Sequence, residues 1–291
     1  MKIACLDVGG TTIKSAVVTV SDPADIKSYD LGAFSFVPTE ATKGFDRIRA
    51  NILSSVSSLA EKYGCDRIAV ATAGTVDWDS GKVTYATDAL PGFTGYDFCR
   101  DLKDVFSMPA TVINDATAAA VAEHCFGDPS GRDVVLTLGT GLGSALVKPG
   151  VLDADCVEDL HLGHIVLHED GYVCKCGNKG CAEQYVSASA LKRDSGVNDI
   201  SQVFTKKEFA KVKADFFENM KKVVEYAISK YAPDDVVIGG GVVEIKKLWW
   251  NDFTSLCDKT GKTVIRPAVL ANKAGVLGAA YSALCGKFKN Q

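Results

Sequence analysis

One short pattern occurs twice in this chain, once near its start and once near its middle. Residues 6–11 read Leu-Asp-Val-Gly-Gly-Thr, and residues 136–141 read Leu-Thr-Leu-Gly-Thr-Gly. In each copy an apolar strand leads into a turn rich in glycine and threonine, and a second apolar strand follows. The repeat predicts an internal duplication, with an α/β fold of two lobes that each open with strand, turn and strand. Lobes of this kind usually face each other across a cleft in which ligands bind.

The spacing of apolar residues predicts where the other strands and helices lie along the chain. Apolar or alternating runs predict strands at 3–8, 13–20, 30–37, 67–72, 110–113, 134–138, 144–147 and 236–238. Apolar positions at helical spacing predict helices at 44–63, 116–126, 206–231 and 273–286. We assign residues 1–115, together with the C-terminal helix at about 273–291, to an N-terminal lobe. Residues 116–272 form the C-terminal lobe.

Composition and charge exclude several classes of protein. The chain has 291 residues, of which 47% are hydrophobic, and this is enough for one large domain or two ordinary ones. A net charge of −4 argues against nucleic acid as a partner, because phosphate binding needs a concentrated basic face. The start of the chain does not read as a signal peptide, and no run is apolar for long enough to cross a bilayer. We therefore expect a cytoplasmic protein without a membrane partner.

The cysteines fall into two groups. In a reducing compartment the 10 cysteines are not expected to form disulfides. Seven of them are isolated in apolar or mixed segments and are expected to pack as small hydrophobic residues, among them Cys5, Cys65, Cys125 and Cys285. The other three are clustered and need a different explanation.

The clustered cysteines lie close to a histidine and predict a metal site, whose ligands would be His164, Cys174, Cys176 and Cys181. One imidazole and three thiolates complete the tetrahedral shell of a structural zinc ion, and they leave no open position for catalysis. Glycines between the last two cysteines allow the chain to fold back around a metal. The alternative is four unligated polar residues. Glu183 follows the last cysteine closely, so a bound zinc would fix its backbone; otherwise it is a surface carboxylate.

Both glycine- and threonine-rich turns have the chemistry of a phosphate site. Glycine lets the backbone approach phosphate oxygens, and threonine adds hydroxyl donors. Either turn alone is more simply an ordinary hairpin, but two of them in duplicated lobes favour a polyphosphate ligand. Asp7 beside such a site is consistent with Mg²⁺. The candidate residues are Asp7, Gly9, Gly10, Thr11, Thr12 and Lys14 in the first copy, and Gly139, Thr140, Gly141 and Gly143 in the second.

Two weaker signals complete the candidate site. Asn114 and Asp115 follow an apolar strand and precede a helix, where either can cap the helix. The same place suits ligand binding, and an aspartate there could accept the proton of an attacking hydroxyl. The residues alone do not decide between these roles. Gly240 and Gly241 follow another apolar strand and could approach a flat ligand such as adenine, although three consecutive glycines are weak evidence.

Taken together, these motifs resemble the ROK family (repressor, open reading frame, kinase) of the sugar-kinase/actin/Hsp70 fold, over nearly the whole chain. The matching segments are 7–11, 74–77, 90–93, 114–116, 139–143, 163–183 and 238–241. The resemblance implies two RNase H-like (actin-like ATPase) lobes across a cleft, with an inserted zinc-binding loop at 164–181. It also implies an ATP-dependent sugar kinase that uses MgATP and a structural Zn²⁺.

The resemblance further implies individual roles. Asp115 would deprotonate a sugar hydroxyl, usually the 6-hydroxyl, for attack on the γ-phosphate. The residues implied to contact the sugar are Asn114, Asp115, His164, Glu183 and Gly74. The family commonly has glutamate three residues before the signature histidine, and His161 stands there in this chain. An imidazole has fewer acceptor sites than a carboxylate, so His161 either alters sugar preference or preserves one hydrogen bond.

Several alternatives remain at the level of sequence. The leading hypothesis is a hexose or N-acetylhexosamine kinase of the glucokinase type, with an N-acetylmannosamine kinase or a fructokinase as variants. ROK regulators carry a DNA-binding domain ahead of the first phosphate turn, for which we expect no room before Asp7. A decayed, non-catalytic sugar-binding protein is disfavoured because the candidate catalytic residues are all present. The identity of the sugar and of the phosphoryl donor stays open, and a homodimer is expected by analogy only.

Overall fold

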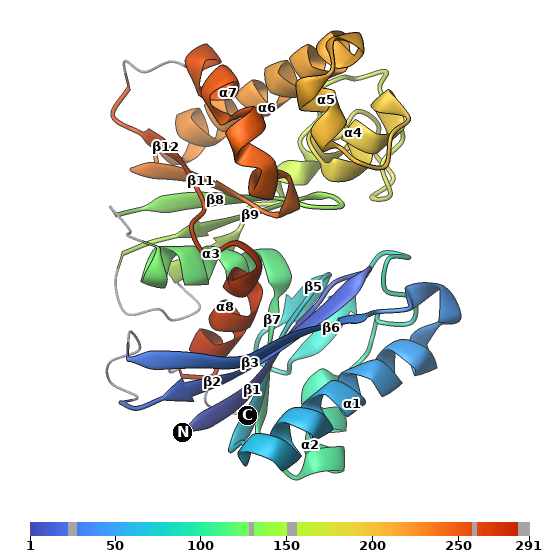
Figure 1. Ribbon diagram of the computed structural model, residues 1–291, viewed down its shortest axis with the longest axis vertical. Coiled ribbons are helices and arrows are strands. Elements are labelled where there is room, and N and C mark those ends of the chain that lie inside the picture. Colours follow the sequence, from blue (N-terminus) through green and yellow to red (C-terminus); the bar gives the residue numbers. More distant parts are fainter. Residues whose placement is uncertain (23–27, 128–130, 150–155, 258–260, 285–291) are drawn as a thin grey trace. The chain divides into compact units, whose positions relative to one another are not determined.

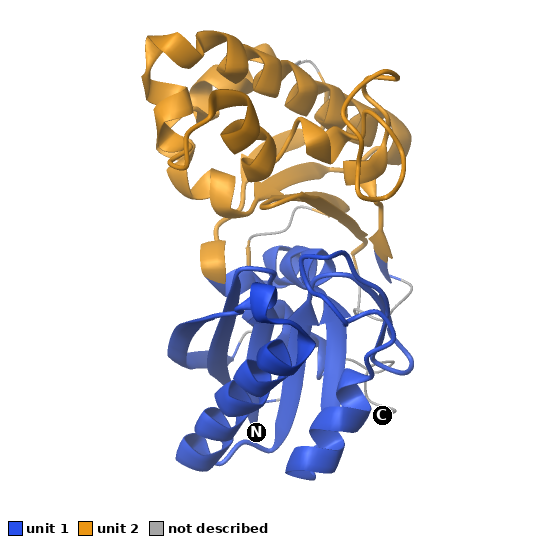
Figure 2. Ribbon diagram, turned by 90° about the vertical axis from the view of Figure 1, so that its right-hand side faces the viewer, with its two compact units in different colours: residues 1–126, 150–157, 273–291 blue, residues 127–149, 158–272 orange. Residues whose placement is uncertain are grey.

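The computed structural model of the protein describes residues 1–22, 28–127, 131–149, 156–257 and 261–284 (Figure 1). The chain forms two compact units (Figure 2). Unit 1 comprises residues 1–126, 150–157 and 273–291, and unit 2 comprises residues 127–149 and 158–272. The division thus falls after Phe126, whereas the sequence suggests a boundary after residue 115. Cys285 and the end of the helix expected at 273–286 lie outside the described residues.

Unit 1 is built on a five-stranded sheet with the strand order β3-β2-β1-β4-β7. Three strands run antiparallel to their neighbours in a meander, namely β1 (Lys2–Val8), β2 (Thr12–Val20) and β3 (Tyr29–Pro38). β4 (Arg67–Thr72) pairs in parallel with β1, and β7 (Ala110–Asn114) pairs in parallel with β4. Every residue of β1 after Lys2 is buried, as expected for a central strand that is covered on both faces.

Helices cover both faces of this sheet (Figure 1). α1 (Phe45–Tyr63) and α2 (Phe98–Phe106) lie on one face, while α3 (Asp115–Phe126) and α8 (Ala274–Ser282) lie on the other. α1 buries apolar residues spaced three and four apart, which form one stripe toward the sheet: Ile48, Ile52, Val56 and Leu59. A short hairpin, β5 (Thr75–Asp77) and β6 (Lys82–Tyr85), lies outside the main sheet.

α3 and α8 pack with their backbones unusually close. A Cβ atom on Gly278 of α8 would lie 1.8 Å from the carbonyl oxygen of Ala118 in α3. Such a contact is possible only without a side chain, because two helical backbones cannot both give way. The glycine therefore fixes how the C-terminal helix packs within unit 1.

Unit 2 repeats the topology of unit 1, with the strand order β10-β9-β8-β11-β12. β8 (Asp133–Leu138) and β9 (Leu142–Val147) form the antiparallel hairpin, and β10 (Val157–Asp159) lies at the edge beside β9. β11 (Asp235–Gly239) pairs in parallel with β8, and β12 (Val264–Pro267) with β11. In both units the hairpin around the glycine- and threonine-rich turn supplies the first two strands. This confirms the repeat predicted from the sequence.

The helices of unit 2 gather on one face of its sheet (Figure 1). They are α4 (Ala188–Ser195), α5 (Ser201–Thr205), α6 (Ala210–Tyr231) and α7 (Trp250–Leu256), with a 3-10 segment, η6 (Gly241–Leu248), before α7. The sequence predicts one helix over 206–231, but α6 begins at Ala210. Lys206 is extended, with φ −98° and ψ 135°, so that α5 ends before it, and a 3-10 turn, η5 (Lys207–Phe209), precedes α6. Among the described residues, no helix has the length and apolar character to cross a membrane.

Candidate active site and metal site

Asp7 lies near the end of β1, shortly before the first glycine- and threonine-rich turn. The antiparallel register places Lys14 of β2 opposite Asp7, and Lys14 Nζ lies 2.8 Å from Asp7 Oδ2. The carboxylate is buried, and the ammonium group keeps partial access to solvent. A Cβ atom on Gly275 of α8 would lie 2.5 Å from Asp7 Cγ, so the carboxylate packs directly against the backbone of that helix. The Asp7 carboxylate is thus fixed by an ion pair with Lys14 and by close packing against the backbone at Gly275.

The first turn, residues 9–12, remains accessible but is firmly supported. Thr11 is exposed, and its glycine neighbours are partly exposed. Thr39 braces the turn from outside, because its hydroxyl donates to Gly9 O and its backbone N–H donates to Thr11 O. Gly10 packs tightly, since a Cβ atom there would lie 3.0 Å from Ala89 O. A rigid glycine turn with accessible peptide groups is suited to phosphate oxygens.

Asn114 and Asp115 divide the two roles that the sequence leaves open. Asn114 Oδ1 accepts from the backbone N–H of Thr117 at 2.9 Å, which is the capping bond of α3. Its Nδ2 donates to Gly74 O at 2.8 Å and so connects α3 with the turn before β5. Asp115 Oδ1 accepts from the N–H of Ala116 at 2.8 Å and from Asn114 Nδ2 at 3.2 Å, whereas Oδ2 accepts no hydrogen bond from the described residues. Asn114 therefore caps the helix, and Asp115 keeps one oxygen for other chemistry.

The environment of Asp115 changes its affinity for a proton. Burial, and next the nearby Asp7 carboxylate, raise the pKa of Asp115 from 3.8 to about 6, while Lys14 acts in the opposite direction. A carboxylate of this basicity accepts a proton more readily than an ordinary surface aspartate and is still largely ionised at neutral pH. Asp115, Asp7 and the first turn all belong to unit 1.

The second turn lies in unit 2 and closes in a similar way. The N–H of Gly139 donates to Gly141 O at 3.0 Å, and the turn leaves Thr140 exposed. β9 starts at Leu142, so Gly143 belongs to the strand and pairs with Thr137. Gly240 packs against the same region and must be glycine, because its φ is 87° and a Cβ atom there would lie 2.5 Å from Leu138 O.

The four predicted metal ligands come together in unit 2. The ligand atoms of His164, Cys174, Cys176 and Cys181 all lie within 4.8 Å of one another. Cys174 Sγ lies 3.7 Å from His164 Nδ1, and Cys176 Sγ lies 3.6 Å from Cys181 Sγ. A tetrahedron with metal–sulfur bonds of about 2.3 Å has edges of roughly 3.8 Å, so these separations fit one metal ion. The donor set suits zinc.

The chain reaches this geometry through two 3-10 turns and a short hairpin. His164 ends η3 (Leu162–His164), and Cys181 precedes η4 (Ala182–Gln184). Backbone bridges between Val173 and Lys179 bring the two middle cysteines round a turn at Gly177, whose φ is 94°. None of the nine cysteines that the structure describes is in a disulfide. Of the isolated ones, Cys5 and Cys257 are buried and the other described ones are partly exposed.

Two predicted sugar-binding residues lie beside the cluster with different surroundings. Glu183 Oε1 accepts from Cys174 Sγ at 2.9 Å and lies 3.9 Å from His164 Nδ1. The side chain of His161 is largely exposed and turns toward Asp159, with its Nδ1 3.2 Å from Asp159 Oδ1. His161 also has a φ of 49°, which is uncommon for a residue with a side chain. The structure thus gives His161 a carboxylate neighbour that the sequence argument does not include.

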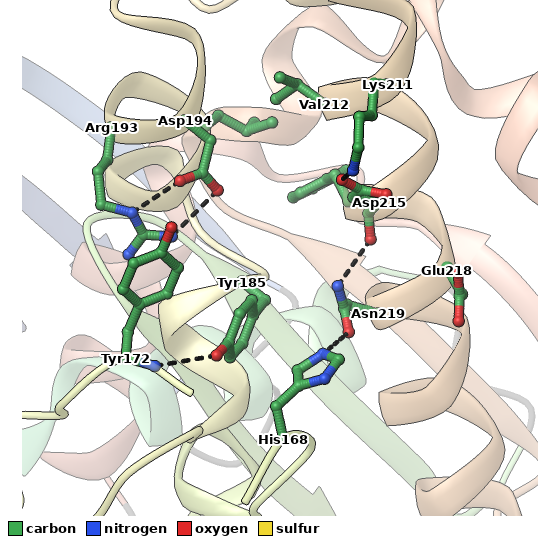
Figure 3. Close-up of a pocket in the computed structure, with 12 residues that line it drawn as sticks. His168, Tyr172, Tyr185, Arg193, Asp194, Lys211, Val212, Asp215, Glu218 and Asn219 are labelled. Carbon is green, nitrogen blue, oxygen red and sulfur yellow. Dashed lines mark hydrogen bonds and ion pairs between the residues drawn. The ribbon is translucent and has the colours of Figure 1, made fainter. Parts of the chain in front are cut away.

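A separate pocket of about 770 Å³ lies between residues 168–185, which belong to the segment with the candidate metal ligands, and helices α4 and α6 (Figure 3). Its described lining residues include none of the predicted site residues. Its polar groups pair with one another, since His168 Nε2 lies 2.7 Å from Asn219 Oδ1 and Arg193 Nε lies 2.7 Å from Asp194 Oδ1. The Arg193 guanidinium also stacks over the ring of Tyr172. The contacts of His168 with Asn219 and of Tyr172 with Arg193 anchor the segment with the candidate metal ligands to α6 and α4.

Sequence reasoning missed three residues that shape the site. Thr39 supports the first turn, Gly275 admits the Asp7 carboxylate, and Asp159 contacts His161. Gly275 and Gly278 are three residues apart in an apolar helix, a spacing that can signal close packing of backbones. Thr39 and Asp159 give no comparable local signal.

With this geometry described, comparison with known proteins identifies the family. The sequence profile of the ROK family matches residues 3–285. The chain belongs to the ROK family. An N-acetylmannosamine kinase from Citrobacter koseri is 29% identical over 97% of this chain and 99% of its own. A glucokinase from Halalkalibacterium halodurans is 27% identical over 95% of this chain and 93% of its own.

Solved structures show the same fold. A ROK family glucokinase from Streptomyces griseus, crystallised with glucose and AMPPNP, matches with a TM-score of 0.80. It is 23% identical, and the match covers 96% of this chain and 98% of that one. The fold of this ROK protein is therefore the α/β, actin-like ATPase type found in the family's sugar kinases.

Proposed function

We propose that this ROK protein is an ATP-dependent kinase that phosphorylates a hexose or N-acetylhexosamine, at the 6-hydroxyl. The observation that carries the proposal is Asp115, which belongs to the same unit as a glycine turn suited to phosphate. One of its oxygens accepts no hydrogen bond from the described residues, and its pKa is raised to about 6. Family membership supports it, as do relatives named glucokinase and N-acetylmannosamine kinase. A general base and a phosphate site are the two parts that phosphoryl transfer to an alcohol requires.

In the proposed reaction Asp115 accepts the proton of the sugar hydroxyl. The oxygen that loses the proton bonds to the γ-phosphorus of ATP, and the bond between that phosphorus and the β,γ-bridging oxygen breaks. ADP leaves and the sugar phosphate forms, so that atoms and charge balance. Asn114 keeps Asp115 in place, because it caps α3 and holds the Gly74 carbonyl at the same time.

The two glycine- and threonine-rich turns would bind the phosphate chain. In the first turn the donors would be backbone N–H groups of residues 10–12, and in the second those of residues 140–143. The N–H groups of Gly9 and Gly139 already donate within their turns, to Thr12 O and Gly141 O. Lys14 adds a positive charge, and Asp7 would hold the Mg²⁺ that accompanies ATP. Gly240 and Gly241 would lie on the adenosine side. When bound, Mg²⁺ would neutralise the negative charge that develops on the phosphoryl oxygens.

We further propose that the cluster in unit 2 holds a structural zinc ion through His164, Cys174, Cys176 and Cys181. The donor set and the separations of 3.6 and 3.7 Å support this assignment. Since His164 Nδ1 faces the cysteines, its other ring nitrogen stays available for a sugar hydroxyl. Glu183 and His161 would contact the sugar as well, and Asp159 would orient the imidazole of His161.

A coupled assay of ADP release tests the proposal. Purified protein, MgATP and a panel of hexoses and N-acetylhexosamines should give turnover with at least one sugar. Asp115→Asn should keep sugar binding, measured by calorimetry, and lose about 10²–10⁴-fold in kcat, which is the usual contribution of a general base. Asp30→Asn, an exposed carboxylate on β3, is the matched control. Absence of turnover on every sugar, or full activity of Asp115→Asn, would contradict the proposal.

A further inference from the structure

The hairpin between β1 and β2 is closed by one backbone hydrogen bond where two are usual. Gly9 and Thr12 flank the two residues of its turn and continue the antiparallel register in which Val8 pairs with Ile13. A hydrogen-bonded pair at such a position exchanges two backbone bonds. The N–H of Gly9 donates to Thr12 O at 3.1 Å, but within the part of the chain that the structure describes the N–H of Thr12 does not donate to Gly9 O in return. The Thr12 N–H is thus left for another acceptor.

The Gly9 carbonyl oxygen is bound by a side chain instead. Thr39, which follows β3, donates its hydroxyl proton to Gly9 O at 2.5 Å. A carbonyl oxygen only accepts, so the direction of this hydrogen bond is fixed. Thr39 has no exposed surface, so it cannot itself touch a ligand. Its hydroxyl takes the place that the Thr12 N–H would take in a fully closed hairpin.

The same residue orients two peptide groups of the turn. The backbone N–H of Thr39 donates to Thr11 O at 3.0 Å, in addition to the hydroxyl bond to Gly9 O. In a planar trans peptide the carbonyl oxygen and the N–H that follows it point in opposite directions. Both carbonyl oxygens point toward Thr39. The N–H groups that follow them, those of Gly10 and Thr12, therefore point away from it. Two N–H donors that face away from the supporting residue are suited to an anion.

Thr39 is itself held in place by α1. Asn51 of that helix reaches the residues on either side of Thr39, with its Nδ2 3.2 Å from Pro38 O and 3.2 Å from Glu40 Oε2. The Glu40 carboxylate is fixed further by Arg47, whose Nε lies 2.5 Å from the same oxygen. The Thr39 hydroxyl thus approaches the turn from a supported position that needs no ligand.

We infer that Thr39 is a positioning residue for nucleotide binding, whose hydroxyl occupies Gly9 O and so leaves the Thr12 N–H available to a phosphate oxygen. Without the hydroxyl, Gly9 O would lack a donor, and the Thr12 N–H would satisfy it by closing the hairpin. The turn would then lose a phosphate donor while its own backbone stays hydrogen-bonded. This inference rests on the proposed function, in which the turn binds the phosphates of ATP.

Affinity for MgADP tests this role without turnover. Thr39→Val keeps the shape of the side chain and removes the hydroxyl, whereas Thr39→Ser keeps the hydroxyl. Calorimetry on the full-length chain should show about 10-fold weaker MgADP binding for Thr39→Val, because a hydrogen bond to a charged phosphate is lost. Thr39→Ser should bind MgADP nearly as the wild type does. Thr111→Val in β7 is the matched control and should not change the affinity, because Thr111 Oγ1 is buried without a hydrogen-bond partner among the described residues.

Hydrogen exchange of the Thr12 amide, followed by NMR, separates this role from plain structural support. In the wild type without nucleotide the Thr12 amide should exchange quickly, and MgADP should protect it. In Thr39→Val it should be protected before nucleotide is added, because it closes the hairpin on Gly9 O. If Thr39 only braces the turn, its hydroxyl is needed for order, and exchange in Thr39→Val becomes faster instead. That result would overturn the inference.

Two further results overturn the inference and leave the kinase proposal standing. One is equal MgADP affinity of Thr39→Val and a wild type that does bind MgADP. The other is a Thr12 amide that is already protected in the wild type without nucleotide, and this measurement does not depend on the folding of any variant. If the wild-type chain binds no MgADP at all, both the proposed function and the inference fail.

Discussion

Asn114 and Asp115 are adjacent and similar in shape, but their side chains make different contacts. Asn114 uses its carbonyl oxygen to cap α3 and its amide to hold Gly74. Asp115 makes one bond to the first turn of the helix and is left with a second oxygen, in surroundings that oppose its charge. The sequence identified the pair but did not show which residue caps the helix, because this depends on which side-chain oxygen accepts a hydrogen bond from which backbone N–H group.

A pH-dependent cost in stability follows from the raised pKa of Asp115. Its folded value of about 6 exceeds the unfolded value of 3.8, so its contribution to stability is complete below pH 3.8 and is lost as pH rises through 6. Asp115→Asn has no such loss. Relative to wild type, the variant should therefore gain about 1–2 kcal/mol between pH 4 and pH 7.5, less than the full shift implies because the side chain retains access to water.

Urea unfolding of both proteins at the two pH values measures this difference. Asp30→Asn, an exposed carboxylate on β3, controls for the loss of one negative charge. If Asp115→Asn and wild type show the same change in the free energy of unfolding between these pH values, the pKa of Asp115 is not raised in the folded protein.

At the scale of elements, the glycines of α8 show what sequence patterns predict only in part. The apolar run predicts the helix itself, and helix propensity alone would favour alanine over glycine at these positions. The structure shows why glycine is needed. Gly275 makes room for the Asp7 carboxylate, and Gly278 allows α8 to contact α3. Both contacts join segments that lie far apart in the chain, so no local pattern contains them.

Gly278→Ala should destabilise the protein despite the better helix propensity of alanine. The added methyl group would lie 1.8 Å from the Ala118 carbonyl oxygen, and separating the two helices should cost about 1–3 kcal/mol in the free energy of unfolding. Gly32→Ala in β3 is the control, because a Cβ atom there has no atom within 4 Å. Chemical denaturation compares the two, and equal stability of Gly278→Ala and wild type would show that the helices are not locked together at this point.

At the scale of the whole molecule, the sequence predicts those features whose residues lie close together along the chain. The two turns and their strands are contiguous, so the duplicated topology could be predicted, and the four candidate metal ligands lie within one short segment. Three contacts could not be predicted from the sequence. They are the hydrogen bonds of Thr39 to the first turn, the approach of Asp159 to His161 and the approach of Glu183 to Gly141. Each of these depends on where a loop or helix returns in space, which a single sequence does not specify.

The composition of unit 1 from both ends of the chain leads to a prediction about truncation. α8 packs against the sheet of unit 1, and Arg67 Nη1 of β4 donates to the Ala283 carbonyl oxygen after α8. Deleting residues from 273 onward should expose β1 and β4, so that hydrogen exchange of their amides becomes fast. Amides of β8 and β11 in unit 2 should keep their protection. Undiminished protection of β1 in the truncated chain would contradict this role of α8.

The same arrangement has a consequence for biosynthesis. The five strands of the first sheet are complete once residue 114 has been made, but the helix that covers β1 and β4 comes from residues 274–282. All of unit 2 is translated in between, on the order of ten seconds of ribosome time. Throughout that interval α3 is already present on that face, but the part over β1 that α8 will cover is open to chaperones or to another nascent chain. Unit 1 begins to leave the ribosome first, but it can complete its fold only after unit 2 has been made, because its last helix follows unit 2 in the chain.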